Sequence, residues 1–144
     1  FSKEKRSEIM SKVRSWNTKP EIKVRKWLHK NGYRFRLHRK DLPGHPDIVL
    51  PKFKTAIFVH GCFWHAHEGS KYATRPSSRK VFWEKKFKAN RKRDRRNYDA
   101  LIAHGWRVTV VWECVLKRER SELQRSIRQI VSWLRGTKKL LEIQ

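Results

Sequence analysis

The segment from His60 to His67 gathers the side chains best suited to chemistry. It reads His-Gly-Cys-Phe-Trp-His-Ala-His, so three histidines and one cysteine fall within eight positions. Histidine near neutral pH can act as a general base or a metal ligand, and a thiolate with imidazoles favours zinc. The alternative is one or two core histidines beside a buried thiol. The density of these groups at the end of an expected strand favours a functional site.

A carboxylate stands at the end of a second segment, Pro43-Gly44-His45-Pro46-Asp47. Pro46 restricts the backbone directly before Asp47, at the start of an expected strand. Mg²⁺ takes oxygen ligands, often one or two carboxylates together with phosphate and water. Asp47 is therefore a candidate Mg²⁺ ligand, the alternative being a solvated aspartate in a turn.

Aromatic and basic groups follow both segments. Phe63 and Trp64 lie in an irregular basic stretch, where large rings can wedge between bases, and Trp83 could assist them; core packing is the alternative. The stretch Asn90-Arg91-Lys92-Arg93-Asp94 lies on an expected helix, and its cations can hold phosphates or form a solvated face. Asn90 and Asp94 share a helix face, so they either order an active site or bond each other.

The charge of the chain narrows the class of partner. The 144 residues carry 37 Lys and Arg against 13 acidic residues, a net charge of +24 with a pI near 10.9. A polyanion relieves this self-repulsion, and nucleic acid releases condensed counterions as its phosphates are neutralised. A basic domain without such a partner and a binder of anionic membrane are the alternatives. The sequence has no run of about 20 apolar residues that could span a membrane.

The chain has two cysteines, Cys62 and Cys114. They could pair, but a lone disulfide is the weaker expectation for a sequence that otherwise looks intracellular. We expect free thiols or metal ligands in an intracellular protein. No signal peptide is recognisable, although a piece before Phe1 could be missing.

The elements that must position these residues follow from periodicity and capping. Thr18-Lys19-Pro20-Glu21 is a strong helix start in which Glu21 completes a capping box, and Asn31-Gly32 ends that helix. Further helices are expected over Ser2–Ser15, Val81–His104 and Ser121–Leu134. Strands are expected over Tyr33–Leu37, Asp47–Leu50, Thr55–His60 and Trp106–Trp112. The order α-α-β-β-β-α-β-α predicts an α/β fold with a mixed sheet flanked by helices.

The chain resembles the very-short-patch repair endonuclease family from about Lys5 to Cys114. The motifs that carry the resemblance are Thr18-Lys19-Pro20-Glu21, Leu42-Pro43-Gly44-His45-Pro46-Asp47, Ile57-Phe58-Val59-His60-Gly61-Cys62-Phe63-Trp64-His65, Phe82-Trp83, Asn90 with Arg93-Asp94, Gly105-Trp106-Arg107-Val108 and Trp112-Glu113-Cys114. It implies a restriction-endonuclease-like fold and Mg²⁺-dependent nicking of double-stranded DNA, 5′ to the thymine of a T·G mismatch. It also implies a bacterial, cytoplasmic, nucleoid-associated enzyme that works beside mismatch-repair proteins.

The resemblance assigns the cleavage residues one by one. Asp47 matches the metal-binding aspartate, and Val59 matches a position whose backbone carbonyl serves the metal. His65 matches the histidine that activates water, and His60 and Glu21 match supporting positions.

It assigns DNA contacts and zinc ligands too. Phe63, Trp64 and Trp83 match intercalating aromatics, Met10 and Val13 match an amino-terminal helix in the minor groove, and Asn90 and Arg93 are expected at the DNA. Cys62, His67 and Cys114 match three of four zinc ligands. Where the family usually has a further cysteine this chain has Glu68-Gly69-Ser70. Serine is a poor zinc ligand, so the site is expected to be three-coordinate, to borrow another group or to be empty. Zinc is expected well below one ion per chain if no substitute ligand exists.

We therefore expect one monomeric endonuclease domain over 1–144, with a DNA-contacting helix in 1–16 and a catalytic core in 17–136. Two alternatives remain: a related nuclease with a different DNA target, and a module that binds distorted DNA without cutting it.

Overall fold

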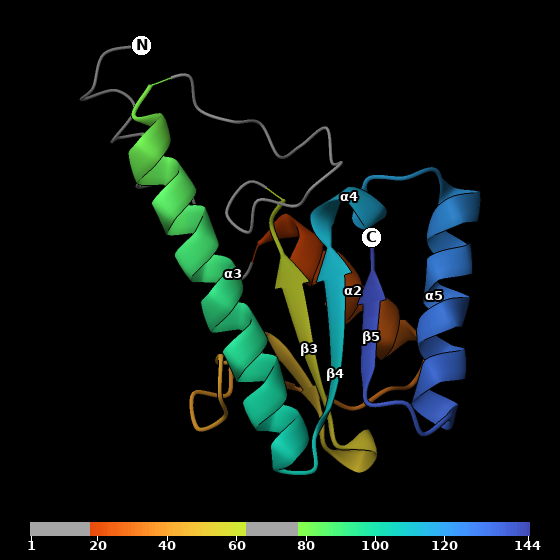
Figure 1. The fold of residues 1–144 in the computed structure, drawn as a ribbon. Coiled ribbons are helices and arrows are strands. Elements are labelled where there is room, and N and C mark those ends of the chain that lie inside the picture. Colours follow the sequence, from red (N-terminus) through yellow and green to blue (C-terminus); the bar gives the residue numbers. More distant parts are fainter. Residues whose placement is uncertain (1–17, 63–77) are drawn as a thin grey trace.

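The fold centres on a five-stranded sheet with helices on both faces (Figure 1). The computed structural model describes residues 18–62 and 78–144. Its elements are α2 (Lys19–Lys30), β1 (Arg36–Leu37), β2 (Ile48–Leu50), the short 3-10 helix η1 (Pro51–Phe53), β3 (Thr55–His60), α3 (Lys80–Ala103), β4 (Arg107–Trp112), α4 (Glu113–Leu116), α5 (Arg120–Arg135) and β5 (Leu140–Ile143). The helix expected over 2–15 lies outside the described residues.

The strand order is β1-β2-β3-β4-β5. β2 runs antiparallel to β1 and to β3, whereas β4 lies parallel to β3 and β5 lies parallel to β4. The long helix α3 provides the crossover from β3 to β4. This mixed sheet flanked by helices confirms the predicted restriction-endonuclease-like α/β fold class.

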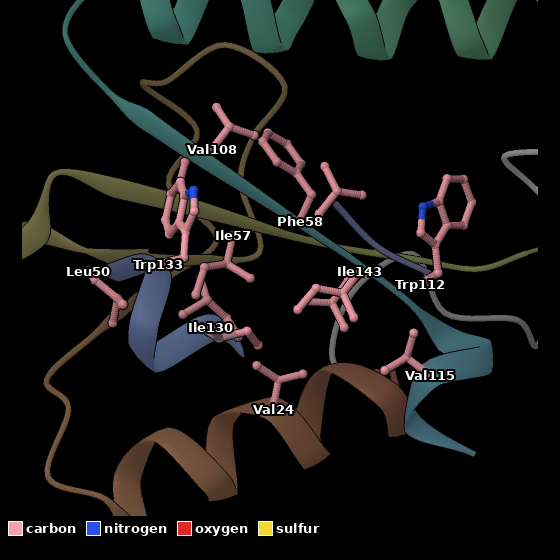
Figure 2. Close-up of a cluster of buried hydrophobic side chains, with 14 of the residues drawn as sticks. Val24, Leu50, Ile57, Phe58, Val108, Trp112, Val115, Ile130, Trp133 and Ile143 are labelled. Carbon is pink, nitrogen blue, oxygen red and sulfur yellow. The ribbon is translucent and has the colours of Figure 1, made fainter. Parts of the chain in front are cut away.

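Helices cover both faces of the central strands, and this explains their continuous burial. Five of the six residues of β3 are buried, as is typical of strands packed on two sides. Phe58 contacts Tyr98 of α3, with ring centroids 5.1 Å apart. On the opposite face, Figure 2 shows Ile57 in the cluster with Val24 of α2 and Ile130 of α5.

Of the two hydrogen bonds predicted to cap the start of α2, only the one accepted by the Thr18 side chain is confirmed. The Glu21 N–H donates to Thr18 Oγ1 at 3.4 Å, and Pro20 occupies the first turn. The Glu21 carboxylate does not close the predicted capping box. It is buried to 1% exposure and bonds residues further along the chain.

Four other expectations need correction. The strand predicted over 33–37 is only Arg36–Leu37, and Leu37 is exposed, because this edge strand pairs with only two residues of β2. Asp47 lies just before β2 and not within it. The short helix α4 was not expected. Nor was β5, which carries the sheet past residue 136, the expected end of the core.

No helix among the described residues is long and apolar enough to cross a membrane.

Candidate active site

A tight turn places Asp47 at the edge of the sheet. The His45 N–H donates to the Leu42 carbonyl at 3.1 Å, with Pro43 and Gly44 at the centre of the turn. Gly44 has φ +78°, the left-handed value that a type II turn requires at this position. A Cβ on Gly44 would lie 3.0 Å from Asn97 Cβ and 3.0 Å from Phe58 Cε1. A side chain at this position would therefore combine a strained backbone with contacts that force Asn97 or Phe58 to shift.

Asp47 binds the end of β3 through its side chain. The ladder between β2 and β3 ends at the pair Ile48 and Ile57. Beyond it, the Val59 N–H donates to Asp47 Oδ2 at 2.8 Å. This bond holds the Asp47 carboxylate against the peptide of Val59, the residue whose carbonyl the sequence analysis expected at the metal.

A buried carboxylate from α2 reaches the same region. Glu21 Oε1 lies 2.5 Å from His38 Nε2 and 3.0 Å from Arg25 Nη2. Arg25 Nη2 is also 3.3 Å from His38 Nε2. The His38 backbone N–H donates to the Asp47 carbonyl at 3.1 Å. His38 thus joins Glu21 of α2 to the segment that carries Asp47.

These residues form a cluster suited to a cation. One ligand atom each from Glu21, His38 and Asp47 lies within 4.8 Å of the others. Glu21 Oε2 is buried and has no hydrogen-bond partner among the described residues. Burying such an oxygen is costly unless something pairs with it. The two carboxylates are oxygen donors of the kind that Mg²⁺ prefers, whereas the imidazole suits transition metals better. The carboxylates of Glu21 and Asp47 therefore fit a Mg²⁺ site, with His38 bonded to Glu21 beside them.

His60 is the last residue of β3, and its side chain lies against α3. Its Nε2 bonds the Tyr98 hydroxyl and lies 3.9 Å from Asp94 Oδ2. Its ring lies edge-on to Trp112, with centroids 5.3 Å apart. Burial, and then the negative charges of Asp94 and other acidic groups including Asp47, raises the pKa of Tyr98 above its ordinary value. Tyr98 is therefore a neutral hydroxyl at physiological pH.

Two of the three expected zinc ligands lie at neighbouring strand ends. The parallel register pairs His60 of β3 with Trp112 of β4, so Cys62 and Cys114 each stand two residues past that pair. Cys62 is fully buried, and its N–H donates to Glu113 Oε1 at 2.9 Å. Neither cysteine is in a disulfide. The third expected ligand, His67, lies outside the described residues.

The remaining expected DNA-contacting residues divide between α3 and the segments that are not described. Trp83 is partly buried against Phe87, with ring centroids 5.8 Å apart. Arg93 is exposed and lies 3.4 Å from Asp94, and Asn90 is half-buried one turn earlier. Met10, Val13, Phe63, Trp64 and His65 lie outside the described residues.

Comparison with known proteins places this site in a family. The family model described as DNA mismatch endonuclease Vsr matches residues 1–71. The type II nicking enzyme V.XorIIP of Xanthomonas oryzae is 53% identical over 131 residues, which cover 91% of this chain and 95% of the relative. The DNA mismatch endonuclease Vsr of Escherichia coli is 36% identical over 132 residues, covering 91% of this chain and 84% of the relative. The chain belongs to the Vsr family. The type II nicking enzyme V.NmeAIP of Neisseria meningitidis is 45% identical over 133 residues, which cover 90% of this chain and 94% of the relative.

As a member of the Vsr family, the chain is a DNA endonuclease. Sequence reasoning did not single out Arg25, His38 or Tyr98. His38 and Tyr98 become notable only through a partner distant in sequence, Glu21 for His38 and His60 for Tyr98, and no local motif signals these two pairs. Arg25 lies one helical turn from Glu21 on α2, a spacing at which opposite charges pair, so a local signal was present there.

Proposed function

We propose that this endonuclease requires Mg²⁺ and nicks DNA 5′ to the thymine of a T·G mismatch. The observation that carries the proposal is the cluster of Glu21, His38 and Asp47 beside the peptide of Val59. Membership of the Vsr family and the name of the Escherichia coli relative support the mismatch as target.

Asp47 and the Val59 carbonyl would hold the metal, with Glu21 beside them. When bound, Mg²⁺ neutralises charge that develops on the scissile phosphate. His65 takes a proton from the attacking water, a task suited to a histidine near neutral pH. Glu21, held by Arg25 and His38, keeps a second carboxylate beside Asp47.

Recognition begins with charge. The net charge of +24 draws the protein to DNA by a salt-sensitive attraction. Phe63 and Trp64, with the amino-terminal segment that contains Met10 and Val13, enter the base stack, and Trp83 assists. A mismatched step is easier to unstack than a paired one, so intercalation favours the mismatch. We propose that the enzyme acts as a monomer in the bacterial cytoplasm, beside mismatch-repair proteins.

A second candidate is nicking at a different DNA target. Two of the relatives are named type II nicking enzymes, without reference to a mismatch. A matched duplex separates the two candidates, because a mismatch enzyme leaves it intact.

The test is a nicking assay on a labelled duplex with one T·G mismatch, with and without Mg²⁺, beside its fully paired twin. We expect Mg²⁺-dependent cutting 5′ to the mismatched thymine alone. Cutting of both duplexes supports the second candidate, and binding without cutting supports a recognition module.

The same assay tests the role of Asp47. Asp47→Ala removes the carboxylate and should abolish nicking, while mismatch binding measured by gel shift stays within about threefold, because phosphate contacts dominate affinity. Wild-type nicking by this variant would refute the assignment.

Zinc content gives an independent prediction. Cys62, His67 and Cys114 supply three thiolate or imidazole ligands, whereas a structural zinc site normally has four. We expect metal analysis of the purified protein to find well below one zinc per chain. Full, tightly held zinc would show that another group completes the site.

A further inference from the structure

Tyr98 lies outside the metal cluster, on the face of the sheet that α3 covers. Its hydroxyl bonds His60 Nε2, and its ring lies against Phe58 as well as His60. The His60 ring also contacts Trp112, its register partner on β4. Contacts from α3, β3 and β4 therefore fix the position of this imidazole.

The chemistry of the phenol decides the direction of the hydrogen bond. Among the described residues, the hydroxyl of Tyr98 bonds no group other than His60. The Tyr98 hydroxyl is partly buried. It has one proton to donate, and leaving that proton unpaired away from water is costly. If His60 Nε2 donated instead, the phenolic proton would lack an acceptor among the described residues. Tyr98 is therefore the donor, and the raised pKa of its hydroxyl keeps that proton in place.

Asp94 lies too far from His60 Nε2 to take the place of Tyr98 as its hydrogen-bond partner. Its Oδ2 lies 3.9 Å from His60 Nε2, beyond hydrogen-bond distance. The carboxylate contributes charge, and through that charge it helps to keep the Tyr98 hydroxyl protonated.

We propose that Tyr98 is a positioning residue that sets the tautomer of His60, so that neutral His60 carries its proton on Nδ1 and acts as a hydrogen-bond donor and not as the general base. Nε2 accepts the phenolic hydrogen bond, so the ring proton of neutral His60 is on Nδ1, and an N–H group donates a hydrogen bond and does not take a proton from water. The catalytic part of this inference rests on the proposed function, which places His60 in the nicking site.

The variant Tyr98→Phe removes the hydroxyl and keeps the ring. The matched control is Tyr33→Phe, since Tyr33 is also partly buried among aromatic rings but lies against Trp27 and Phe53. The first readout is the ¹⁵N spectrum of the histidine rings in the metal-free, DNA-free protein, with His60 assigned by the His60→Asn variant. We expect the Nδ1–H tautomer in the wild type and in Tyr33→Phe, and a mixture of tautomers in Tyr98→Phe.

The second readout is single-turnover nicking of the T·G duplex with saturating enzyme. A lost orienting bond should slow the nicking step by roughly 10- to 100-fold in Tyr98→Phe, with DNA affinity within twofold of wild type and Tyr33→Phe unchanged. Thermal unfolding checks that both variants are folded.

The outcomes separate cleanly. An unchanged tautomer in Tyr98→Phe, or an unchanged nicking rate, overturns the proposal. A wild-type protein that does not nick the T·G duplex refutes the proposed function instead, and the ¹⁵N spectra still decide whether Tyr98 sets the tautomer.

Discussion

At the scale of single residues, the buried carboxylate of Glu21 depends on hydrogen-bonding partners supplied by its neighbours. Its side chain is 1% exposed, and an ionised carboxylate removed from water needs compensating partners. Arg25 supplies one from the next turn of α2, and His38 supplies another from the end of β1. The carboxylate is thereby held beside Asp47 without depending on solvent.

We predict that Arg25→Met lowers the free energy of unfolding by about 2 kcal/mol, because it leaves a buried carboxylate with one partner fewer. The matched control is Arg95→Met. Arg95 also pairs with an acidic residue four positions away, Asp99, but both side chains are more than half exposed. That change should cost less than about 0.5 kcal/mol. Urea unfolding followed by tryptophan fluorescence measures both, and equal losses would contradict the claim that burial makes the first pair matter.

Residue chemistry could be predicted only where a local signal exists. Asp47 was singled out because Pro46 precedes it at the start of an expected strand. His38 was passed over because its neighbours in sequence are ordinary strand and turn residues, and its partner Glu21 lies 17 positions away. Tyr98 lies 38 positions from His60. Contacts of this kind arise from the packing of elements, which no spacing rule shows.

At the scale of elements, the turn before β2 must fit against α3 and β3 at once. Gly44 makes this possible, since it combines a left-handed backbone with a lack of room for a Cβ. Gly32, just after α2, has nearly the same φ, +81°, but a Cβ added there would meet no atom within 4 Å. Substituting each of the two glycines therefore distinguishes the cost of backbone strain from the cost of crowding by neighbouring atoms.

We predict that Gly32→Ala costs about 1 kcal/mol, the strain of a left-handed residue with a side chain. Gly44→Ala should cost about 1–2 kcal/mol more, because the methyl group must displace Asn97 or Phe58. It should also slow nicking at least about tenfold, since the displaced turn carries Asp47. Thermal unfolding and the nicking assay on both variants test this. Similar losses of stability would show that crowding contributes nothing at Gly44.

The elements themselves were predictable where their signals are local. The Thr18-Pro20 start of α2 and the β-branched run of β3 gave the bounds observed or nearly so. The strand β5 was missed because its four residues, Leu140–Ile143, follow a basic stretch and show no alternation. The strand β5 forms by pairing with β4. This contact depends on the tertiary fold and cannot be predicted from the local sequence.

At the scale of the whole molecule, the two long helices α3 and α5 lie on different sides of the sheet (Figure 1). Both carry exposed cations, so net charge alone does not say which side meets DNA. The proposed role of His60 in nicking indicates which side. His60 faces α3, and Arg93 of α3 lies beside Asp94, which is near His60. If His60 acts at the cleaved bond as proposed, the cations of α3 are placed to hold the neighbouring phosphates.

This placement predicts a difference between two substitutions that remove the same charge. Arg93→Gln on α3 should weaken DNA binding and reduce the slope of log K against log salt by about 0.9, the effect of one lost phosphate contact. The matched control is Arg128→Gln, an exposed arginine of α5. It lowers the net charge equally but should leave the slope unchanged, since long-range attraction is screened beyond about 10 Å at 0.1 M salt.

Fluorescence anisotropy with a labelled duplex over a series of salt concentrations provides both slopes. Equal slopes in the two variants would mean that DNA does not contact the α3 side at Arg93, and a reduced slope in Arg128→Gln alone would place DNA on the α5 side.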